Sequence, residues 1–422
     1  MKIIKKFDVI IIGGGASGLF AGSILSAQNI KVAIIEKNQR IGKKILQTGN
    51  GKCNLSNKDL SLSNYFGDHA FIKKVFDTSP QKKIFEEFDK IGVELLTNEE
   101  NRIFPKSFQA SSVLDSLRFS IEENGGIIIC DSNAVSVEKK GEEFIIKTRS
   151  SVEEFICEKV IVSIGGISGI ERPDRNFFEF IKKLGHTIVE PMPSLVQLKL
   201  EGTLHRSMEG NKWFAGVSIY EGETLLASDK NEILFTEYGI SGNAILNISR
   251  YAVESIRKNK KTILSLNLFP DESKNEVIEN LKKRRKNLKK RKMENLFNGW
   301  LNKRIGISLI KSCSIELSRP VKTLKDKEVD LLANILHDWR FEIKSDNGFF
   351  TSQVMAGGVN TDEIDPETME SKIIKNLYFA GEIINVDGKS GGYNLHFAWA
   401  TGYAASSKII AGGNNSPQGV VS

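Results

Sequence analysis

Three glycines and one acidic residue near the start of the chain have the spacing of a dinucleotide-binding site. In the pattern Gly13-x-Gly15-x-x-Gly18, the first glycine permits a tight turn, the second admits a pyrophosphate, and the third lets a helix pack on a strand. Glu36 lies where an acid accepts hydrogen bonds from ribose hydroxyls and repels a 2′-phosphate. These residues predict a dinucleotide other than NADP, against the alternative of a glycine turn without a ligand.

The elements around this turn are those that the pattern requires. Phe7–Ile12 is a continuous apolar run, which is typical of a strand buried on both faces of a parallel sheet. Ser17–Ala27 suits a helix, and Lys31–Glu36 suits the next strand. The glycine pattern therefore lies inside a predicted βαβ unit, where the helix N-terminus presents free N–H groups to phosphates.

Two further glycine-rich segments favour FAD over NAD. Residues 40–54 form a basic loop after the acidic residue, and its charges and backbone N–H groups could hold phosphate and flavin oxygens. Near the C-terminus, the apolar strand Asn376–Ala380 precedes a glycine turn, and a helix begins near Asn394. Backbone donors there could stabilise the negative charge of a reduced flavin. Asp387 could contact the ribityl chain or act as a turn residue.

Together these clusters resemble the YhiN/BaiN-like flavoproteins, also called the aminoacetone oxidase-like FAD-binding family. The resemblance rests on GGGASG (13–18), GKKILQTGNGKCN (42–54), VMAGGVNTDEIDPETMESK (354–372) and NLYFAGEIINVDGKSGGYNLHFAWATG (376–402). It covers essentially the whole chain, and the middle matches in layout more than in motif. The chain departs from the family pattern after Gly166, where the usual Gly-Asp-Gly run is absent.

The resemblance implies noncovalent FAD and its contacts. The implied cofactor-binding residues are Gly13, Gly15, Ala16, Ser17, Gly18, Glu36, Lys37, Lys43, Thr48, Gly51, Cys53, Asn54, Val135, Gly165, Gly381, Glu382, Gly392, Asn394 and Leu395. We add Asp387 to this set. His396 replaces a glutamine that is common in the family and is a weak candidate proton donor, although a structural role is favoured.

We expect an α/β fold: a discontinuous Rossmann-like FAD-binding domain with an inserted β-barrel-like domain and a nested helical subdomain. The expected boundaries are 1–192 and 353–422 for the FAD-binding domain, 193–270 with a return strand at 338–352 for the β domain, and 271–337 for the helices. The β domain is predicted from short strands separated by turn residues, such as Phe214–Tyr220 and Ile263–Leu268.

The expected activity is that of an FAD-dependent oxidoreductase acting on a small organic substrate, in the oxidase or the reductase direction. The chain has no second G-x-G-x-x-G inside a βαβ unit, so a nicotinamide reductant, NAD(P)H, would dock transiently at the flavin. A flavoprotein that senses redox state without turnover is a further alternative. The four cysteines form no CxxC pair and no metal spacing, so we expect neither a dithiol relay nor a metal site.

An RNA-associated or RNA-modifying flavoprotein is the alternative from a different class. Nine of the eleven residues 282–292 are basic. A solvated helix face is favoured for this run, since it lacks interleaved aromatic residues. The net charge of +7 allows an anionic ligand without requiring one, and no apolar run is long enough to span a bilayer. We expect a cytoplasmic protein without membrane contact.

Overall fold

The computed structural model describes residues 4–149, 154–171 and 177–413. Part of the segment that departs from the family pattern, residues 172–176, lies outside the described residues. The chain divides into two compact units. The first comprises residues 1–167, 172–192 and 354–422, and the second comprises residues 168–171 and 193–353.

The first unit is built on a mainly parallel sheet that places three glycine-containing turns at one edge. The strand order is β7-β2-β1-β10-β9-β8, and β19 also pairs with β10. The pairs β7–β2, β2–β1, β1–β10 and β10–β19 are parallel, whereas β9 is antiparallel to both β10 and β8. The strands are β1 (Ile4–Ile12), β2 (Val32–Ile35), β7 (Ile127–Ile129), β8 (Ala134–Lys140), β9 (Glu143–Thr148), β10 (Glu154–Val162) and β19 (Leu377–Phe379). The turns after β1, β10 and β19 therefore leave the same, carboxyl edge of the sheet.

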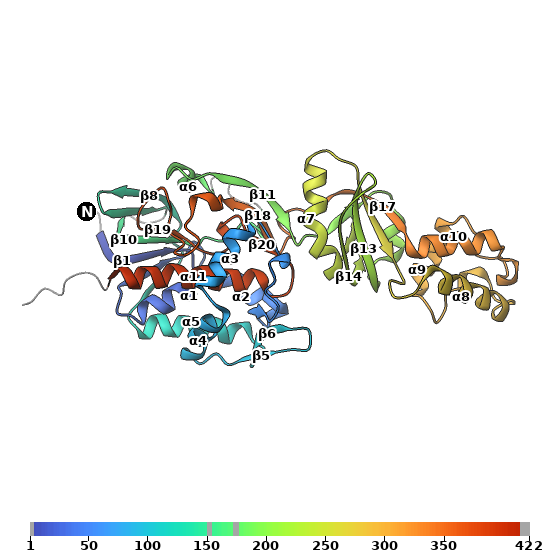
Figure 1. Ribbon diagram of the computed structural model, residues 1–422, viewed down its shortest axis with the longest axis horizontal. Coiled ribbons are helices and arrows are strands. Elements are labelled where there is room, and N and C mark those ends of the chain that lie inside the picture. Colours follow the sequence, from blue (N-terminus) through green and yellow to red (C-terminus); the bar gives the residue numbers. More distant parts are fainter. Residues whose placement is uncertain (1–3, 150–153, 172–176, 414–422) are drawn as a thin grey trace, which may run out of the picture. The chain divides into compact units, whose positions relative to one another are not determined.

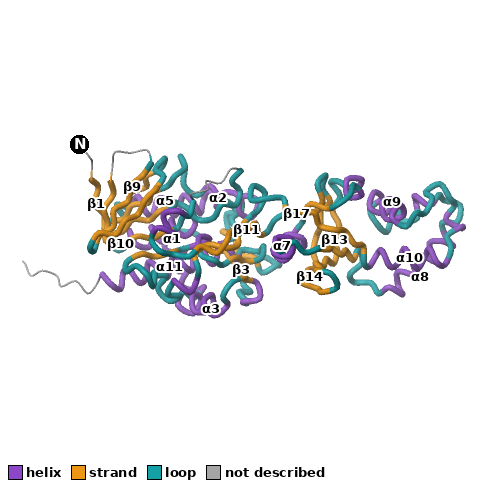
Figure 2. The backbone as a smooth tube through the Cα atoms, turned by 90° about the horizontal axis from the view of Figure 1, so that it is seen from above, coloured by secondary structure: helices purple, strands orange, loops and turns teal. Residues whose placement is uncertain are grey.

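Helices from the two ends of the chain pack side by side on this sheet (Figures 1 and 2). A Cβ on Gly402 of α11 (Tyr393–Gly413) would lie 2.8 Å from the backbone oxygen of Ser17 in α1 (Ala16–Ser26), so the two helices are in close contact. Phe20 and Trp399 add an edge-to-face pair with ring centroids 5.5 Å apart. The other helices of this unit are α2 (Lys43–Gln47), α3 (His69–Thr78), α4 (Gln81–Lys90), α5 (Ala110–Glu123) and α6 (Glu179–Lys183).

Short strands complete the first unit. They are β3 (Ser56–Asn57), β4 (Tyr65–Phe66), β5 (Leu95–Thr97), β6 (Arg102–Pro105), β11 (Ile188–Ser194), β18 (Val354–Val359) and β20 (Asp387–Gly388). The sequence predicts mainly helix for 70–125, but β5 and β6 interrupt the helices there because β6 pairs with both β3 and β5. The C-terminal helix begins at Tyr393, next to the expected start near Asn394.

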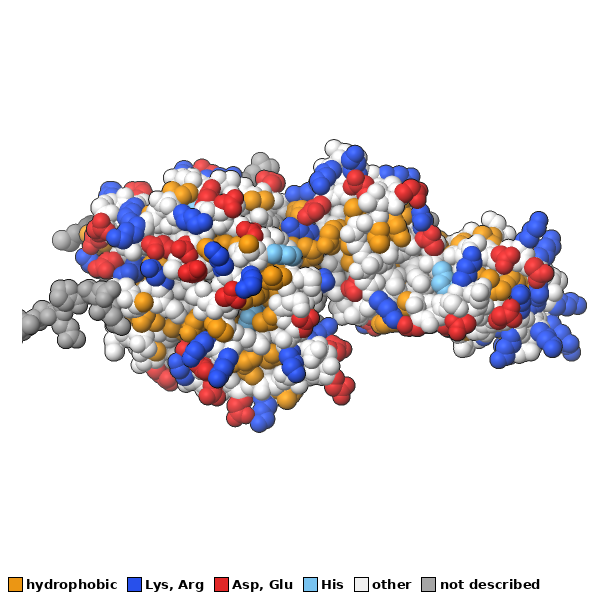
Figure 3. All heavy atoms as spheres, in the orientation of Figure 1, with side chains coloured by type: hydrophobic (Ala, Val, Ile, Leu, Met, Phe, Trp, Pro, Cys, Tyr) orange, Lys and Arg blue, Asp and Glu red, His pale blue; other side chains and the backbone are white. Residues whose placement is uncertain are grey.

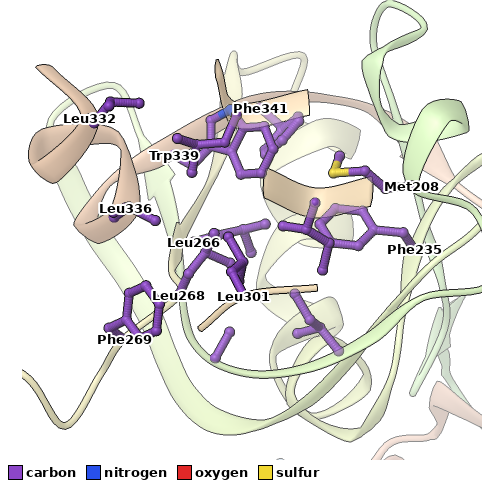
Figure 4. Close-up of a cluster of buried hydrophobic side chains, with 14 of the residues drawn as sticks. Met208, Phe235, Leu266, Leu268, Phe269, Leu301, Leu332, Leu336, Trp339 and Phe341 are labelled. Atoms are coloured by element: carbon purple, nitrogen blue, oxygen red, sulfur yellow. The ribbon is translucent and has the colours of Figure 1, made fainter. Parts of the chain in front are cut away.

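The second unit contains a closed barrel with the strand order β12-β15-β14-β13-β16-β17. Its strands are β12 (Leu198–Leu200), β13 (Lys212–Glu221), β14 (Thr224–Phe235), β15 (Gly239–Ser241), β16 (Thr262–Asn267) and β17 (Trp339–Asp346), and α7 (Asn243–Arg257) packs against them. The barrel and the three helices α8 (Lys274–Asn287), α9 (Lys303–Ser312) and α10 (Asp326–His337) share one hydrophobic core. Figure 4 shows Leu332 and Leu336 of α10 beside Trp339 and Leu266 of the barrel. The expected fold class, a Rossmann-like domain with an inserted barrel and nested helices, is confirmed.

Candidate functional site

The three glycines of the first turn have different environments. Gly13 has a φ of +108°, and a Cβ there would lie 2.4 Å from the backbone oxygen of Ser163. A Cβ on Gly18 would lie 2.1 Å from the backbone oxygen of Gly13. Around Gly15, by contrast, no described heavy atom beyond its chain neighbours lies within 4 Å of the Cβ position. Two glycines are therefore required by packing, while Gly15 leaves its backbone open to a ligand.

The start of α1 offers backbone donors in this open space. Its N-cap, Gly15, makes no side-chain capping bond, and the first turn carries no acidic residue. Unsatisfied N–H groups and the positive end of the helix dipole favour an anion at such a terminus. The Ser17 hydroxyl instead donates to the Ala380 oxygen (3.2 Å), which joins α1 to the turn after β19. Gly381 follows with a φ of +79°, and a Cβ there would lie 2.4 Å from Ser17 Oγ.

Glu36 is buried at the end of β2 and holds the glycine turn. Its Oε2 accepts from the Gly14 N–H (2.8 Å), and its Oε1 accepts from the backbone N–H (2.8 Å) and the side-chain amide (2.5 Å) of Asn38. A carboxylate has about four acceptor positions, so one on Oε2 remains for a ribose hydroxyl.

The segment before β8 lies beside Glu36. The Ser132 N–H donates to the Glu36 backbone oxygen (2.9 Å), and the register of β8 shifts between Ala134 and Ser136. This irregularity includes Val135, which is exposed, and its contact with the cofactor stays a prediction. Lys37 is also exposed, with its ammonium 4.8 Å from the centroid of the Phe177 ring.

The basic loop forms α2 and a short 3-10 turn, Thr48–Gly51. Lys43 and Gly51 are exposed on it, and the Thr48 hydroxyl donates to the Ile45 oxygen (2.6 Å). Cys53 is fully buried, and burial raises the pKa of its thiol to about 12. A thiol with such a pKa is neutral at physiological pH, which fits a packing role and not a nucleophile.

The loop at 42–54 meets the C-terminal turn at Asn54. The Asn54 Oδ1 atom is buried and has no hydrogen-bond partner among the described residues. A Cβ on Gly392, whose φ is +96°, would lie 2.8 Å from this oxygen and 2.5 Å from the Ser56 backbone oxygen. A buried acceptor without a donor is costly, so this atom suits a ligand that brings a donor.

Beside this acceptor, the turn before α11 is held by its own side chains. The Asn394 amide pairs with the backbone of Gly388 in both directions, at 2.8 Å for each bond. Asp387 is buried in β20, which pairs with β4, and Leu395 is partly buried at the start of α11. The Asn394 side chain thus fixes the turn, while the first N–H groups of α11 remain as donors for a ligand.

The Glu382 carboxylate joins three segments of the first unit. It accepts from the backbone N–H groups of Gly166 (3.1 Å) and Met355 (2.9 Å) and from Lys44 Nζ (2.8 Å). The bond to Gly166 fixes the turn that begins at Gly165, whose φ is +70°. These bonds give Glu382 a positioning role, and its contact with the cofactor stays a prediction.

His396 lies on α11 in a fully buried environment. Its Nδ1 is 3.0 Å from Ser56 Oγ, its ring lies 5.3 Å from that of Phe76, and its Nε2 has no partner among the described residues. Burial lowers the pKa of this imidazole to about 3. The ring is neutral at physiological pH, which favours the structural role over that of a protonated acid.

Comparison with known proteins adds the family to this geometry. The HI0933-like protein Rossmann domain matches residues 7–408. The chain belongs to the HI0933-like family. A 3-dehydro-bile acid delta(4,6)-reductase of Clostridium scindens is 32% identical over 94% of this chain and 97% of its own length. A ribosomal RNA dihydrouridine synthase of Escherichia coli is 26% identical over 97% of this chain and 99% of its own.

A solved structure shows the same fold. The 3-ketosteroid delta1-dehydrogenase of Sterolibacterium denitrificans superposes with a TM-score of 0.53 at 10% identity, over 97% of this chain and all of that one. Its family and its relatives show that the chain is an FAD-dependent oxidoreductase. Within the described residues, no helix has the length and apolar character needed to cross a membrane, and no cluster of His, Cys, Asp or Glu could hold a metal ion.

Residues that hold the site together were missed by sequence reasoning. Ser163 donates to the backbone oxygens of Ile12 (3.1 Å) and Gly13 (3.0 Å). Asn38 donates to the Glu36 carboxylate, and Lys44 donates to the Glu382 carboxylate. Ser163 directly follows an apolar strand, which is a weak signal for a polar contact between strand ends. The partners of Asn38 and Lys44 follow from the folded loops and have no signal in the spacing.

Proposed function

We propose that this protein is a reductase that saturates a carbon–carbon double bond conjugated to a carbonyl group. The observation that carries the proposal is the pair of full-length relatives. A delta(4,6)-reductase acts on a 3-dehydro bile acid, and a dihydrouridine synthase acts on RNA. The Δ4,6 bonds of a 3-oxo steroid and the 5,6 bond of uracil are both conjugated to a carbonyl. The names of both relatives are therefore consistent with one reaction, the reduction of a double bond conjugated to a carbonyl.

The residues of the first unit fit FAD. The open backbone at Gly15 and the N-terminus of α1 would hold the pyrophosphate, and Glu36 would accept from the ribose. Asn54 Oδ1 would accept from a donor of the ribityl chain or flavin ring. The N–H groups at the start of α11 would face the pyrimidine oxygens, where the helix dipole favours negative charge. When bound, FAD supplies two-electron transfer between a nicotinamide and the substrate.

The net reaction balances without a further reactant. NAD(P)H and one proton are consumed, NAD(P)⁺ is released, and the substrate gains hydrogen at both carbons of the double bond. The carbon remote from the carbonyl receives the hydride equivalent, and the carbon next to it receives the proton. The chain would bind and orient the substrate and exclude oxygen, which competes for the same electrons.

A product assay tests this proposal. Purified holoprotein is incubated anaerobically with NADPH or NADH and a 3-oxo-4-ene steroid, and the product is examined by mass spectrometry. We expect a mass gain of two hydrogens, with deuterium from the labelled nicotinamide carbon at the carbon remote from the carbonyl. Nicotinamide consumption only in the presence of oxygen, with an unchanged alkene, would indicate an oxidase instead.

A further inference from the structure

The basic run 282–292 divides into structural cations and free cations. Arg284 donates through Nε to the Leu296 oxygen (2.6 Å) and through Nη2 to the Asn298 oxygen (2.6 Å), and its guanidinium lies 5.5 Å from the Trp300 ring centroid. Arg285 bonds the Leu324 oxygen (2.9 Å) and Asp326 (2.8 Å). These arginines tie α8 to the segments around it, so packing explains them.

The remaining cations have no such explanation. Lys282 forms an ion pair with Glu279 (2.9 Å). In the part of the chain that the structure describes, the other six cations of the run and the neighbouring Lys322 are exposed and make no ion pair or side-chain hydrogen bond. We call these seven residues the cationic face: Lys283, Lys286, Lys289, Lys290, Arg291, Lys292 and Lys322. In Figure 3, Lys and Arg side chains gather at the end of the second unit that carries α8.

Backbone contacts bring the cationic face together from two segments. The Lys322 N–H donates to the Lys289 oxygen (3.4 Å), and the Val321 N–H donates to the Arg291 oxygen (2.8 Å). Burial lowers the pKa of the Arg284 guanidinium, and the nearby charge of Arg291 lowers it further. Placing like charges together costs free energy in the isolated protein, which an anionic partner would recover.

The helix dipole explains part of the pattern. Arg284, Arg285 and Lys286 lie in the last turn of α8, where cations are favoured. Residues 289–292 lie beyond the end of that helix at Asn287, in the following turn. Since the dipole effect falls off within the last turn, it does not account for them.

The chemistry of the surface selects among anionic partners. Of the apolar residues of α8, Val277 and Leu281 are fully buried in the shared core and Ile278 is partly buried against it, so the helix offers no broad apolar face to a lipid bilayer. No large apolar side chain within 282–292 is exposed, which disfavours a protein interface with an apolar centre. Clustered lysines and arginines without apolar anchors are what a phosphodiester backbone requires.

We propose that the cationic face is a docking surface for RNA. Two observations point to RNA as the partner: the charge of the surface is complementary to phosphate, and a ribosomal RNA dihydrouridine synthase aligns with 97% of this chain. This inference rests on the proposed function only in that a uracil ring contains the required conjugated double bond. The surface positions an RNA by its phosphates, and recognition of the base belongs to the flavin-containing unit.

Binding of a fluorescein-labelled hairpin RNA to the full-length holoprotein tests the surface. We expect the triple variant Lys289→Glu, Lys290→Glu, Arg291→Glu to bind at least tenfold more weakly at low salt. The slope of log affinity against log salt should fall by about 2–3, since each lost phosphate contact contributes roughly 0.7–0.9. At about 0.15 M salt, where the Debye length is about 8 Å, a matched variant that reverses three scattered exposed lysines, Lys74, Lys82 and Lys260, should stay within about twofold of wild type, because charges outside the binding surface are then screened.

Three outcomes overturn the inference: no salt-dependent binding by wild type, equal loss in the two triple variants, or patch-dependent binding to anionic vesicles but not to RNA. A Lys289→Gln, Lys290→Gln, Arg291→Gln variant with normal flavin content and thermal unfolding separates lost charge from lost folding. Reduction of a small conjugated alkene by the Glu variant should remain at the wild-type rate. Patch-dependent RNA binding without any alkene reduction would contradict the proposed function while supporting this inference.

Discussion

At the scale of single residues, Gly15 and Gly18 should respond differently to the same added methyl group. Gly18→Ala places Cβ 2.1 Å from a backbone oxygen and should cost about 1–3 kcal/mol or more of unfolding free energy. The Cβ of Gly15→Ala has no described atom beyond its chain neighbours within 4 Å and should leave the apoprotein stable, but it crowds the approach of the pyrophosphate. We expect at least a tenfold weaker FAD affinity, measured by flavin fluorescence. Equal FAD affinities for Gly15→Ala and wild type would refute the assignment of this turn.

His396 should affect the pH dependence of stability more than catalysis. The pKa of the buried ring is about 3, whereas an unfolded histidine titrates near about 6.5. Between these values the unfolded chain binds more protons, so the free energy of unfolding falls as the pH drops from about 6.5 towards 3. His396→Gln should flatten this dependence in urea titrations between about pH 4 and 7.

At about pH 8 the His396 ring is neutral in both the folded and the unfolded chain, so the same variant measures the packing change alone. Identical pH slopes for His396→Gln and wild type would contradict a neutral buried ring. An inflection in the turnover rate that disappears with the variant would instead support a catalytic proton.

At the scale of elements, Glu382 holds the turn after β10, the start of β18 and α2 together. Glu382→Gln keeps the size of the side chain but leaves it one acceptor oxygen for backbone donors. We expect a loss of about 1–3 kcal/mol in unfolding free energy and weaker FAD binding. Lys44→Met removes a partly exposed ion pair and should cost no more than about 1 kcal/mol. Chemical denaturation of the two variant apoproteins measures both losses in unfolding free energy. A larger loss for Lys44→Met than for Glu382→Gln would contradict the positioning role of Glu382.

Substitutions of two adjacent cations of α8 should differ in their effect on thermal stability. Arg284→Lys removes the two-carbonyl bridge to Leu296 and Asn298, and we expect a clear drop in thermal stability. Lys283→Met removes an exposed cation and should leave thermal stability nearly unchanged. Differential scanning calorimetry compares them, and similar melting temperatures for both variants would show that Arg284 is not structural.

At the scale of the whole molecule, the sequence predicts the elements whose signals are local. The apolar strand, glycine turn and helix at residues 7–27 form as expected, because a buried parallel strand reads as a continuous apolar run. Strands β5 and β6 were missed, since a short pairing with β3 leaves little periodicity in the sequence. The roles of Ser163, Asn38 and Lys44 depend on contacts across segments, which no spacing records.

The same distinction holds for the site. The glycines, Glu36 and the turn at Gly392 could be recognised because each satisfies a backbone requirement of its own position. The Asn54 acceptor became evident only when both ends of the chain were brought together, since its missing partner is a property of the folded environment. The division of residues 282–292 into structural and free cations likewise requires the tertiary contacts of Arg284 and Arg285.

Anaerobic re-oxidation of the reduced holoprotein tests the central claim most directly. The protein is reduced with one equivalent of NADPH or NADH, and a conjugated 3-oxo-4-ene steroid is then added while the visible flavin absorbance is followed. We predict that the oxidised spectrum returns in proportion to the alkene added and that the saturated 3-oxo steroid has no effect. A spectrum that stays reduced with every conjugated alkene, uracil-containing RNA included, and recovers only with oxygen would contradict the account.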